Sequence, residues 1–380
     1  MSVLPLAPPA KSPLARYRLL SPTASVRVSP LCLGGSNFGD AWAHYVGACD
    51  QKTTEGILDF FYEQGGNFID TSNNYQSEES EKRIGEWMKK RGIRDQMVIA
   101  TKYTTNFHAG RGDKEIIVNF NGNGSKSLHT SVEGSLKKLQ TDYIDLLYVH
   151  WWDFSASIPE LMQSLNHLVA ARKVLYLGIS DAPAWVVAKA NEYARCNALR
   201  QFCVYQGQWS AAARDFERDI IPMCRAEGMG LAAWGSLGGG MFKTEEQRQK
   251  QKEQKEGRSQ VLEPSDAQIK ACEALEAVAK RKNSTITSIA LAYVTSKAPY
   301  VFPIVGGRNV DHLEGNIEAL NIKLSDDDIK EIEDASPFDI GFPNNFLYGE
   351  KLPDNPGAVW LLAVGGTLDH VPEPKPLAKE

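Results

Sequence analysis

The sequence predicts an α/β fold, a (β/α)8 barrel of the TIM type. Two observations support this. Eight short apolar segments are each followed by a stretch with helical patterning, and most of the connections between them are short. Strands that alternate with helices in this way favour a parallel sheet. Eight such units in a chain of 380 residues suit a closed barrel better than an open sheet.

The elements follow one another in a regular order. The expected strands cover residues 29–33, 67–70, 97–101, 143–149, 173–179, 202–205, 229–234 and 301–305. The expected helices cover residues 53–64, 78–90, 128–140, 158–170, 183–195, 215–227, 265–282 and 310–319. Ahead of the first strand, residues 16–20 and 25–28 flank a Ser-Pro-Thr turn and predict a small N-terminal hairpin.

The composition divides the chain into three parts. Residues 1–15 are rich in proline and are expected to be a flexible N-terminal extension. Residues 16–334 are assigned to the barrel. Residues 335–380 form a C-terminal tail with proline, glycine and spaced aromatic residues. We expect this tail either to cover the substrate mouth of the barrel or to pack on its side.

Two long insertions interrupt the alternation. Residues 103–126 follow the third strand and contain several glycines, so we expect a flexible loop. Residues 242–263 follow the seventh strand and are highly charged, which is typical of a solvated loop or helix. Both belong to the end of a barrel where substrate loops lie.

A doubly wound Rossmann fold is the structural alternative. It requires the spacing G-x-G-x-x-G after the first strand. The sequence there is Gly34-Gly-Ser-Asn-Phe-Gly39, in which the second glycine comes one position early. The barrel is therefore favoured.

Bulk properties exclude several classes of protein. The net charge of −5 argues against nucleic acid as a partner, because phosphate binding requires a basic surface. No apolar run approaches 18 residues, so no membrane span is expected. The N-terminus lacks the pattern of a secretory signal. The six cysteines form no C-x-x-C pair, which indicates free thiols, no structural metal site and a cytoplasmic location.

Three of the expected strands end in residues that carry chemistry. Asp70 ends one strand, and Tyr75 follows it on a polar turn; Lys102 and His150 end two others. An ammonium beside a phenol favours the phenolate and eases proton exchange, and a histidine can orient a carbonyl oxygen. The set suits carbonyl reduction, with the hydride supplied by a cofactor. A metal-dependent barrel hydrolase is the alternative, but it requires converging metal ligands, and no H-x-H pair is present.

Over residues 16–325 the sequence resembles the aldo-keto reductase superfamily. The residues that match its catalytic tetrad are Asp70, Tyr75, Lys102 and His150. The resemblance implies that Tyr75 donates the proton, that Lys102 lowers the pKa of Tyr75, and that Asp70 holds Lys102. It also implies that His150 orients the carbonyl group.

The resemblance extends to residues that bind NADP(H) in that superfamily. It implies contacts to the nicotinamide from Asp70, Ser180, Asp181, Gln206 and Trp234, with Asp181 standing where asparagine is usual. An aspartate cannot donate to the carboxamide oxygen. The remaining implied cofactor contacts are Gly35, Ser36, Gly235, Ser236, Leu237, Gly239, Gly306, Arg308, His312 and Asn316. Arg308 is the implied contact to the 2′-phosphate, which favours NADP over NAD.

Within the superfamily, the chain resembles fungal aryl-alcohol dehydrogenases and norsolorinic-acid-type ketoreductases. The resemblance lies in Tyr148-Val-His-Trp-Trp-Asp153 and in the stretches around Ser180, Gln206 and Trp234. It implies an aromatic aldehyde or ketone as substrate, in fungal secondary metabolism, with Trp151, Trp152 and Phe38 lining its site. We expect a monomer or a weak homo-oligomer. The functional alternative is a cofactor-binding regulatory subunit similar to the β subunits of potassium channels.

Overall fold

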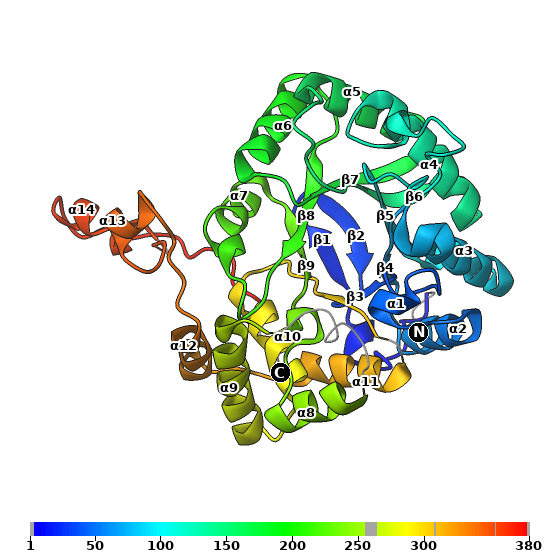
Figure 1. The fold of residues 1–380 in the computed structure, drawn as a ribbon. Coiled ribbons are helices and arrows are strands. Elements are labelled where there is room, and N and C mark those ends of the chain that lie inside the picture. The colour runs from blue at the N-terminus through cyan, green and yellow to red at the C-terminus, as the bar shows by residue number, and fades with distance from the viewer. Residues whose placement is uncertain (1–3, 255–263, 308, 354, 378–380) are drawn as a thin grey trace.

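The computed structural model describes residues 4–254, 264–307, 309–353 and 355–377, and Figure 1 shows a ring of strands surrounded by helices. Eight parallel strands run in the order β10-β3-β4-β5-β6-β7-β8-β9. The ring closes where Leu231 of β9 pairs with Val301, just ahead of β10. The strands are β3 Cys32–Gly34, β4 Phe68–Asp70, β5 Val98–Tyr103, β6 Ile144–Val149, β7 Val174–Ser180, β8 Phe202–Gln208, β9 Gly230–Trp234 and β10 Ile304–Val305. The predicted (β/α)8 barrel is confirmed.

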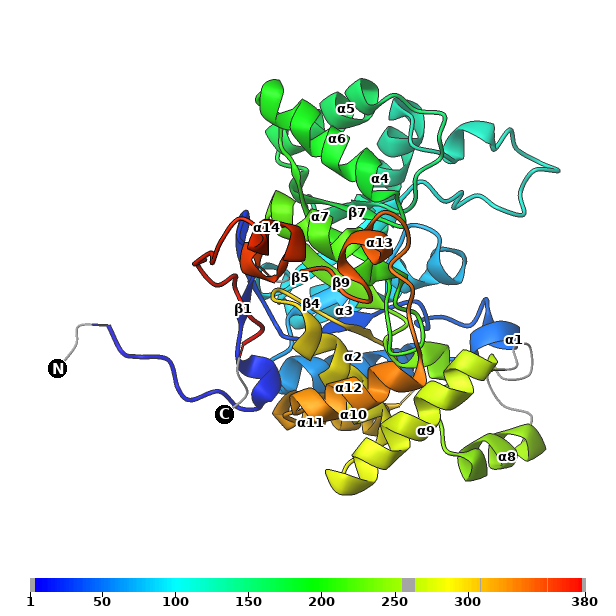
Figure 2. The same cartoon turned by 90° about the vertical axis from the view of Figure 1, so that its left-hand side faces the viewer.

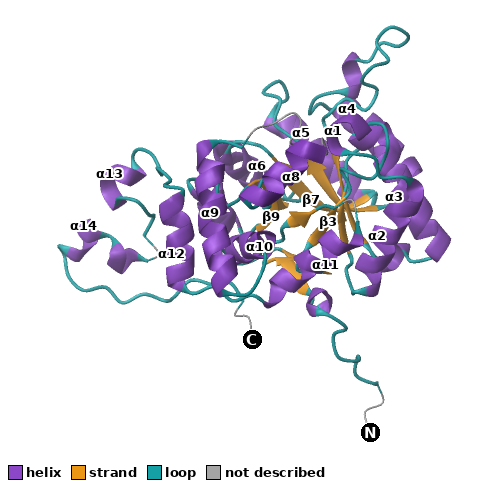
Figure 3. Cartoon of the chain, turned by 60° about the horizontal axis from the view of Figure 1, so that its bottom comes forward, coloured by secondary structure: helices purple, strands orange, loops and turns teal. Residues whose placement is uncertain are grey.

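Helices surround the strands on the outside, as Figure 3 shows in purple around orange. None of those in the described part of the chain is long and apolar enough to cross a membrane. Those up to β9 are α1 Ala43–Val46, α2 Gln51–Glu63, α3 Glu79–Arg91, α4 Ser125–Leu139, α5 Ile158–Ala170, α6 Ala184–Cys196 and α7 Ile220–Glu227. Those after β9 are α8 Glu245–Gln254, α9 Asp266–Arg281, α10 Ile286–Lys297, α11 Val310–Glu318, α12 Asp326–Ala335, α13 Asn344–Tyr348 and α14 Trp360–Ala363.

The predicted N-terminal hairpin is confirmed and closes one end of the barrel. Its strands are β1 Arg18–Ser21 and β2 Ala24–Val28, paired antiparallel. Leu20 and Val28 are fully buried, in one apolar cluster with Phe68 and Phe302 of the barrel. Leu20 also lies against the start of β9, where a Cβ on Gly230 would come 2.2 Å from the Leu20 carbonyl oxygen. Because the hairpin covers the amino ends of the strands, the carboxyl ends are left for chemistry.

Several helical regions differ from the prediction, which had no counterpart of α1, α12, α13 or α14. The expected helix 215–227 is a short 3-10 turn, Asp215–Glu217, followed by α7. The reason is Pro222, which has no N–H to bond the carbonyl four residues earlier and is tolerated only in the first turn of a helix. Helix α10 was not expected. Residues 288–294 are all buried, so the segment lacks the amphipathic period that marks a surface helix.

The two ends of the chain contact the outside of the barrel. At the N-terminus, the expected flexible extension is anchored from Ser12 onward, since its hydroxyl donates to the Gln64 carbonyl at 2.7 Å and Leu14 is fully buried. In the C-terminal tail, α13 and α14 project outward from the barrel beyond α12 (Figure 1), and Figure 2 looks at them from that side. It is tied to the α7 side by an ion pair between Arg225 and Glu373 at 2.9 Å. Part of the second insertion forms α8, and residues 255–263 lie outside the described residues.

We predict that Gly230→Ala destabilises the barrel by about 1–3 kcal/mol, because the added Cβ meets backbone rather than a movable side chain. The matched control is Gly56→Ala in α2, where an added Cβ has nothing within 4 Å. That change should stabilise the protein by about 0.5–1 kcal/mol through helix propensity. Urea denaturation measures both. Equal effects of the two substitutions would contradict the role given to the hairpin contact.

Candidate active site

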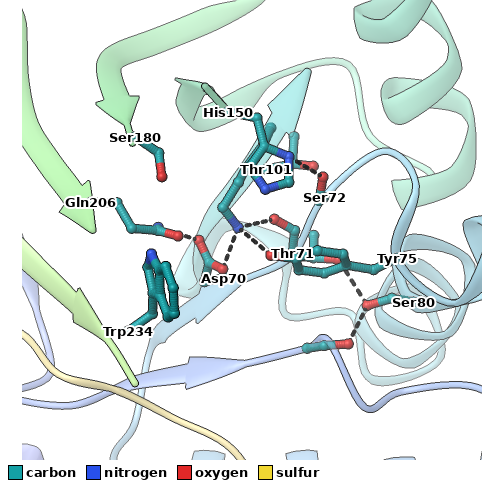
Figure 4. A network of polar contacts seen from close by, with 12 residues as sticks. Asp70, Thr71, Ser72, Tyr75, Ser80, Thr101, His150, Ser180, Gln206 and Trp234 are labelled. Atoms are coloured by element: carbon teal, nitrogen blue, oxygen red, sulfur yellow. Dashed lines mark hydrogen bonds and ion pairs between the residues drawn. The ribbon is translucent and has the colours of Figure 1, made fainter. Parts of the chain in front are cut away.

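The barrel brings the predicted residues to one rim. Asp70 ends β4, Lys102 lies near the end of β5, and His150 directly follows β6. Ser180, Gln206 and Trp234 occupy corresponding positions at the carboxyl ends of β7, β8 and β9. Because the strands are parallel and adjacent in this order, their carboxyl ends surround one site. Figure 4 shows these side chains converging from different strands.

Lys102 is the centre of the site. Its side chain is fully buried, and its ammonium contacts a carboxylate oxygen of Asp70. The same nitrogen donates to the Thr71 carbonyl at 2.7 Å and to the Tyr75 hydroxyl at 3.3 Å (Figure 4). The second oxygen of Asp70 accepts from the Gln206 amide at 2.9 Å. The buried charge is thus surrounded by acceptors, as a buried ammonium requires.

The pKa values of this cluster favour a protonated phenol beside a charged lysine. Burial raises the pKa of Tyr75, and the Lys102 ammonium opposes that rise without reversing it. For Lys102, burial lowers the pKa, but Asp70 and Tyr75 together outweigh burial and the net direction is upward. The expected lowering of the Tyr75 pKa by Lys102 is therefore present as a contribution, whereas the net shift has the opposite sign.

His150 is held as a neutral ring. Burial, and then the charge of Lys102, lower its pKa to about 3. Its Nδ1 lies 3.2 Å from the Thr105 hydroxyl and 3.3 Å from the Ser72 hydroxyl. Its ring meets that of Tyr75 edge to face, with centroids 5.9 Å apart. A neutral ring whose Nδ1 is occupied by hydroxyl groups presents Nε2 to a ligand.

The turn after Tyr75 is strained. Gln76, Ser77 and Glu78 all have left-handed φ values, of 53°, 51° and 81°. For residues other than glycine this conformation costs about 1–2 kcal/mol each, so neighbouring groups must hold it. The buried Gln76 side chain accepts from the Trp42 backbone N–H at 2.8 Å and donates to the Ser36 carbonyl at 2.9 Å. Strain of this kind is concentrated at functional sites.

Gly35 permits close packing behind Asp70. Its N–H donates to the Asp70 carbonyl at 2.7 Å, and its own carbonyl accepts from the Ser80 hydroxyl at 2.8 Å. A Cβ at Gly35 would come 2.9 Å from that hydroxyl oxygen. The Ser80 hydroxyl also lies 2.8 Å from the Thr71 hydroxyl, which ties the start of α3 to the strand end (Figure 4).

The residues implied in nicotinamide binding form a second group on the same rim. The Trp234 indole N–H donates to Asp181 at 3.3 Å, and the Ser180 hydroxyl donates to the other oxygen of Asp181 at 2.9 Å. The Trp234 ring is half-buried, whereas Gln206 is buried. Figure 4 places Ser180, Gln206 and Trp234 together on the side of Asp70 away from Tyr75. An aromatic face beside amide and hydroxyl groups fits a flat carboxamide ring.

The segment after Trp234 suits the approach of a phosphate group. Gly235, Gly238, Gly239 and Gly240 have φ values of 73°, 63°, 65° and 89°, and Gly239 and Gly240 face open space. Left-handed glycines allow a backbone to curve closely around an anion. In this segment Ser236 is buried and Leu237 is half-buried.

The residues implied at the adenine end are placed around the start of α11. Gly306 is exposed, and a Cβ there would lie 3.8 Å from the Gly34 carbonyl oxygen of the neighbouring strand. The His312 N–H donates to the Asn309 side chain at 3.0 Å, and Asn316 is buried. Arg308, the implied contact to the 2′-phosphate, lies outside the described residues.

Two of the three residues expected to line the substrate are buried. Phe38 is fully buried, in an apolar cluster with Ile84 and Trp87. Trp152 is 8% exposed and belongs to another buried cluster. The substrate-lining role of these two residues stays a prediction. Trp151 remains half-exposed, and its indole N–H donates to the Thr105 hydroxyl at 3.0 Å.

Sequence reasoning missed several neighbours of the site. The half-buried Trp42 meets the Tyr75 ring edge to face, with centroids 6.2 Å apart. Thr105 and Ser72, which contact His150, were also not singled out. Ser72 lies in the polar run after Asp70 and could have been noticed, whereas nothing in the local sequence marks Trp42 or Thr105.

Comparison with known proteins gives consistent matches. The model of the aldo/keto reductase family matches residues 30–337. Norsolorinic acid reductase B of Dothistroma septosporum is 55% identical over 94% of this chain and 93% of its own length. Norsolorinic acid reductase A of Aspergillus parasiticus is 52% identical over 99% of this chain and 96% of its own length. An aryl-alcohol dehydrogenase of Pestalotiopsis microspora is 52% identical, over 98% and 95%.

We predict that Lys102→Met destabilises the protein by about 3–5 kcal/mol, because it leaves the Asp70 carboxylate buried without a counter-charge. Adding Asp70→Asn to this variant should recover part of the loss. Equilibrium unfolding in urea of Lys102→Met, Asp70→Asn, the double variant and the wild type is the measurement. If the double variant is as unstable as the sum of the single variants, the two groups do not form a coupled pair.

Proposed function

This chain belongs to the aldo/keto reductase family, and from that premise we propose that it is an NADP(H)-dependent oxidoreductase that reduces aromatic aldehydes or ketones to alcohols. In reverse it acts as an aryl-alcohol dehydrogenase. One observation carries the proposal. The buried ammonium of Lys102 contacts both Asp70 and the Tyr75 hydroxyl, and the neutral His150 ring meets the Tyr75 ring edge to face.

The side chains divide the proton chemistry among them. Tyr75 donates the proton to the carbonyl oxygen, because burial keeps its phenol protonated at neutral pH. Lys102 stabilises the phenolate that is left, since its ammonium is already in place at 3.3 Å. Asp70 fixes the ammonium. Neutral His150 donates a hydrogen bond from Nε2 to the same carbonyl oxygen while Thr105 and Ser72 occupy Nδ1.

A nicotinamide cofactor, when bound, supplies the hydride that these side chains cannot provide. Trp234 would stack on its ring, and Ser180, Asp181 and Gln206 would hold the carboxamide. The glycine-rich segment 235–240 would hold the pyrophosphate. The half-buried Trp234 face and the left-handed glycines support this assignment. The preference for NADP over NAD rests on Arg308 and is part of the proposal.

An aromatic substrate class is supported by two half-exposed rings near the site. Trp42 lies against Tyr75, and Trp151 directly follows His150. Aromatic walls favour a flat ligand through stacking and edge contacts. Relatives named norsolorinic acid reductase and aryl-alcohol dehydrogenase support the same class and a place in fungal secondary metabolism.

We predict that Tyr75→Phe lowers kcat for veratraldehyde reduction by at least about 100-fold, since the proton donor is removed. NADPH binding, followed by fluorescence, should be unchanged because Trp234 and Gln206 are untouched. Unaltered turnover in this variant would remove Tyr75 as the acid. A wild-type protein that binds NADPH tightly but oxidises it with no carbonyl compound would favour the regulatory-subunit alternative.

A second prediction concerns pH. With the pKa of His150 at about 3 and that of Tyr75 raised above its usual 10, neither group changes charge between pH 5 and 8. The kcat for reduction should therefore be flat across this range. It should fall only at alkaline pH, where the phenol loses its proton. Stopped-flow or steady-state kinetics in constant-ionic-strength buffers give the profile. An inflection near pH 6.5 that disappears in His150→Gln would contradict the neutral-histidine assignment.

A further inference from the structure

The loop between β5 and α4, residues 104–124, is folded rather than flexible as the sequence suggested. Its His108 ring stacks on Phe120 with centroids 4.0 Å apart, and His108 Nδ1 lies 2.7 Å from a carboxylate oxygen of Glu115. The Asn106 amide donates to the Ile117 carbonyl at 3.0 Å. These contacts cross the loop at three places and give it a defined shape. A displacement at one end of the loop can therefore displace the other end.

The base of this loop holds His150. The Thr105 hydroxyl lies 3.2 Å from His150 Nδ1 and accepts from the Trp151 indole at 3.0 Å. The Thr105 carbonyl accepts from the Asn73 amide at 3.0 Å, and Asn73 lies two residues before Tyr75. The start of the loop thus contacts the neighbours of both groups that face the substrate oxygen in the proposed reaction.

The tip of the loop reaches the turn that carries Tyr75. The Arg111 guanidinium forms an ion pair with one carboxylate oxygen of Glu78. The other oxygen lies 3.3 Å from the ammonium of Lys138 in α4. Glu78 is the third of the consecutive left-handed residues after Tyr75, and α3 begins directly after it. A displacement of this carboxylate therefore displaces the left-handed turn itself.

Within the described part of the chain, Arg111 forms its ion pair with Glu78 alone. Lys138 is shared, because its ammonium also contacts Glu81 at 2.8 Å and the Asn73 carbonyl at 2.8 Å. The Glu78 side chain is 12% exposed, so its charge requires compensation. The Arg111 side chain is 42% exposed and extends from the loop, so it can be replaced without opening the core.

We propose that Arg111 and Glu78 are positioning residues for the proton donor. Their ion pair joins the loop 104–124 to the left-handed turn and so fixes the Tyr75 hydroxyl against Lys102. A substrate that binds against the loop therefore also affects the position of the Tyr75 hydroxyl. The inference rests on the proposed role of Tyr75 and deepens it.

The test compares Arg111→Met, Glu78→Gln, the double variant and Arg111→Lys with the wild-type protein. The matched control is Lys114→Met, which removes a positive charge from an exposed position of the same loop. Veratraldehyde and NADPH are the substrates. The readouts are kcat, KM, the solvent deuterium isotope effect on kcat, and the Kd of NADPH by fluorescence.

We expect kcat to fall between about 10-fold and 100-fold in each single variant, as for a small displacement of a reacting group. The double variant should be no worse than either single variant, and Arg111→Lys should recover most of the activity. The solvent isotope effect should rise, because proton transfer becomes slower. The Kd of NADPH and the kinetics of Lys114→Met should stay at their wild-type values.

Two results would overturn the proposal. A rise in KM alone, with kcat and the isotope effect unchanged, would show that Arg111 contacts the substrate directly. A decrease in kcat of the double variant that equals the product of the two single decreases would show that the two residues act independently. If Glu78→Gln fails to fold, the Arg111 variants decide the question through kcat and the isotope effect. Failure of the proposed function looks different, since the wild type would then be inactive or Tyr75→Phe would stay active.

Discussion

The buried ammonium of Lys102 is the interaction on which the rest of the site depends. A positive charge in the interior of a barrel is unfavourable unless acceptors surround it. Asp70, the Thr71 carbonyl and the Tyr75 hydroxyl provide them. The Lys102 ammonium requires these partners, and its charge in turn holds them in place. Gln206 completes the arrangement by donating to the free oxygen of Asp70.

The same ammonium sets the protonation states around it. It opposes the rise that burial produces in the pKa of Tyr75, and it adds to the fall that burial produces in the pKa of His150. One group thus remains a phenol and the other a neutral imidazole. A protonated donor beside an uncharged ring suits delivery of a proton to a carbonyl oxygen without a competing cation at the histidine.

The Tyr75 phenol is positioned by a strained turn, and contacts with neighbouring segments hold that turn in place. Tyr75 leads into three left-handed residues, which are unfavourable in isolation. Gln76 is tied to the segment after β3 on one side, and Glu78 to Lys138 and Arg111 on the other. The turn is therefore stable only in the assembled barrel. This links the activity proposed for the site to the packing of loops far from it in the sequence.

The sequence by itself determined the barrel, the hairpin, and the three strand-end residues Asp70, Lys102 and His150 that lie around Tyr75. It could do so because strand and helix periods, and polar residues at strand ends, are local signals. Helix α10 was missed because it is apolar on all sides. The burial of Phe38 and Trp152 was not foreseen, because an aromatic residue has the same local pattern in a core and at a site. Only the tertiary structure decided the Arg111–Glu78 pair, the Trp42 contact and the direction of the Tyr75 pKa shift. Each of these depends on burial and on contacts between distant segments, which no local pattern encodes.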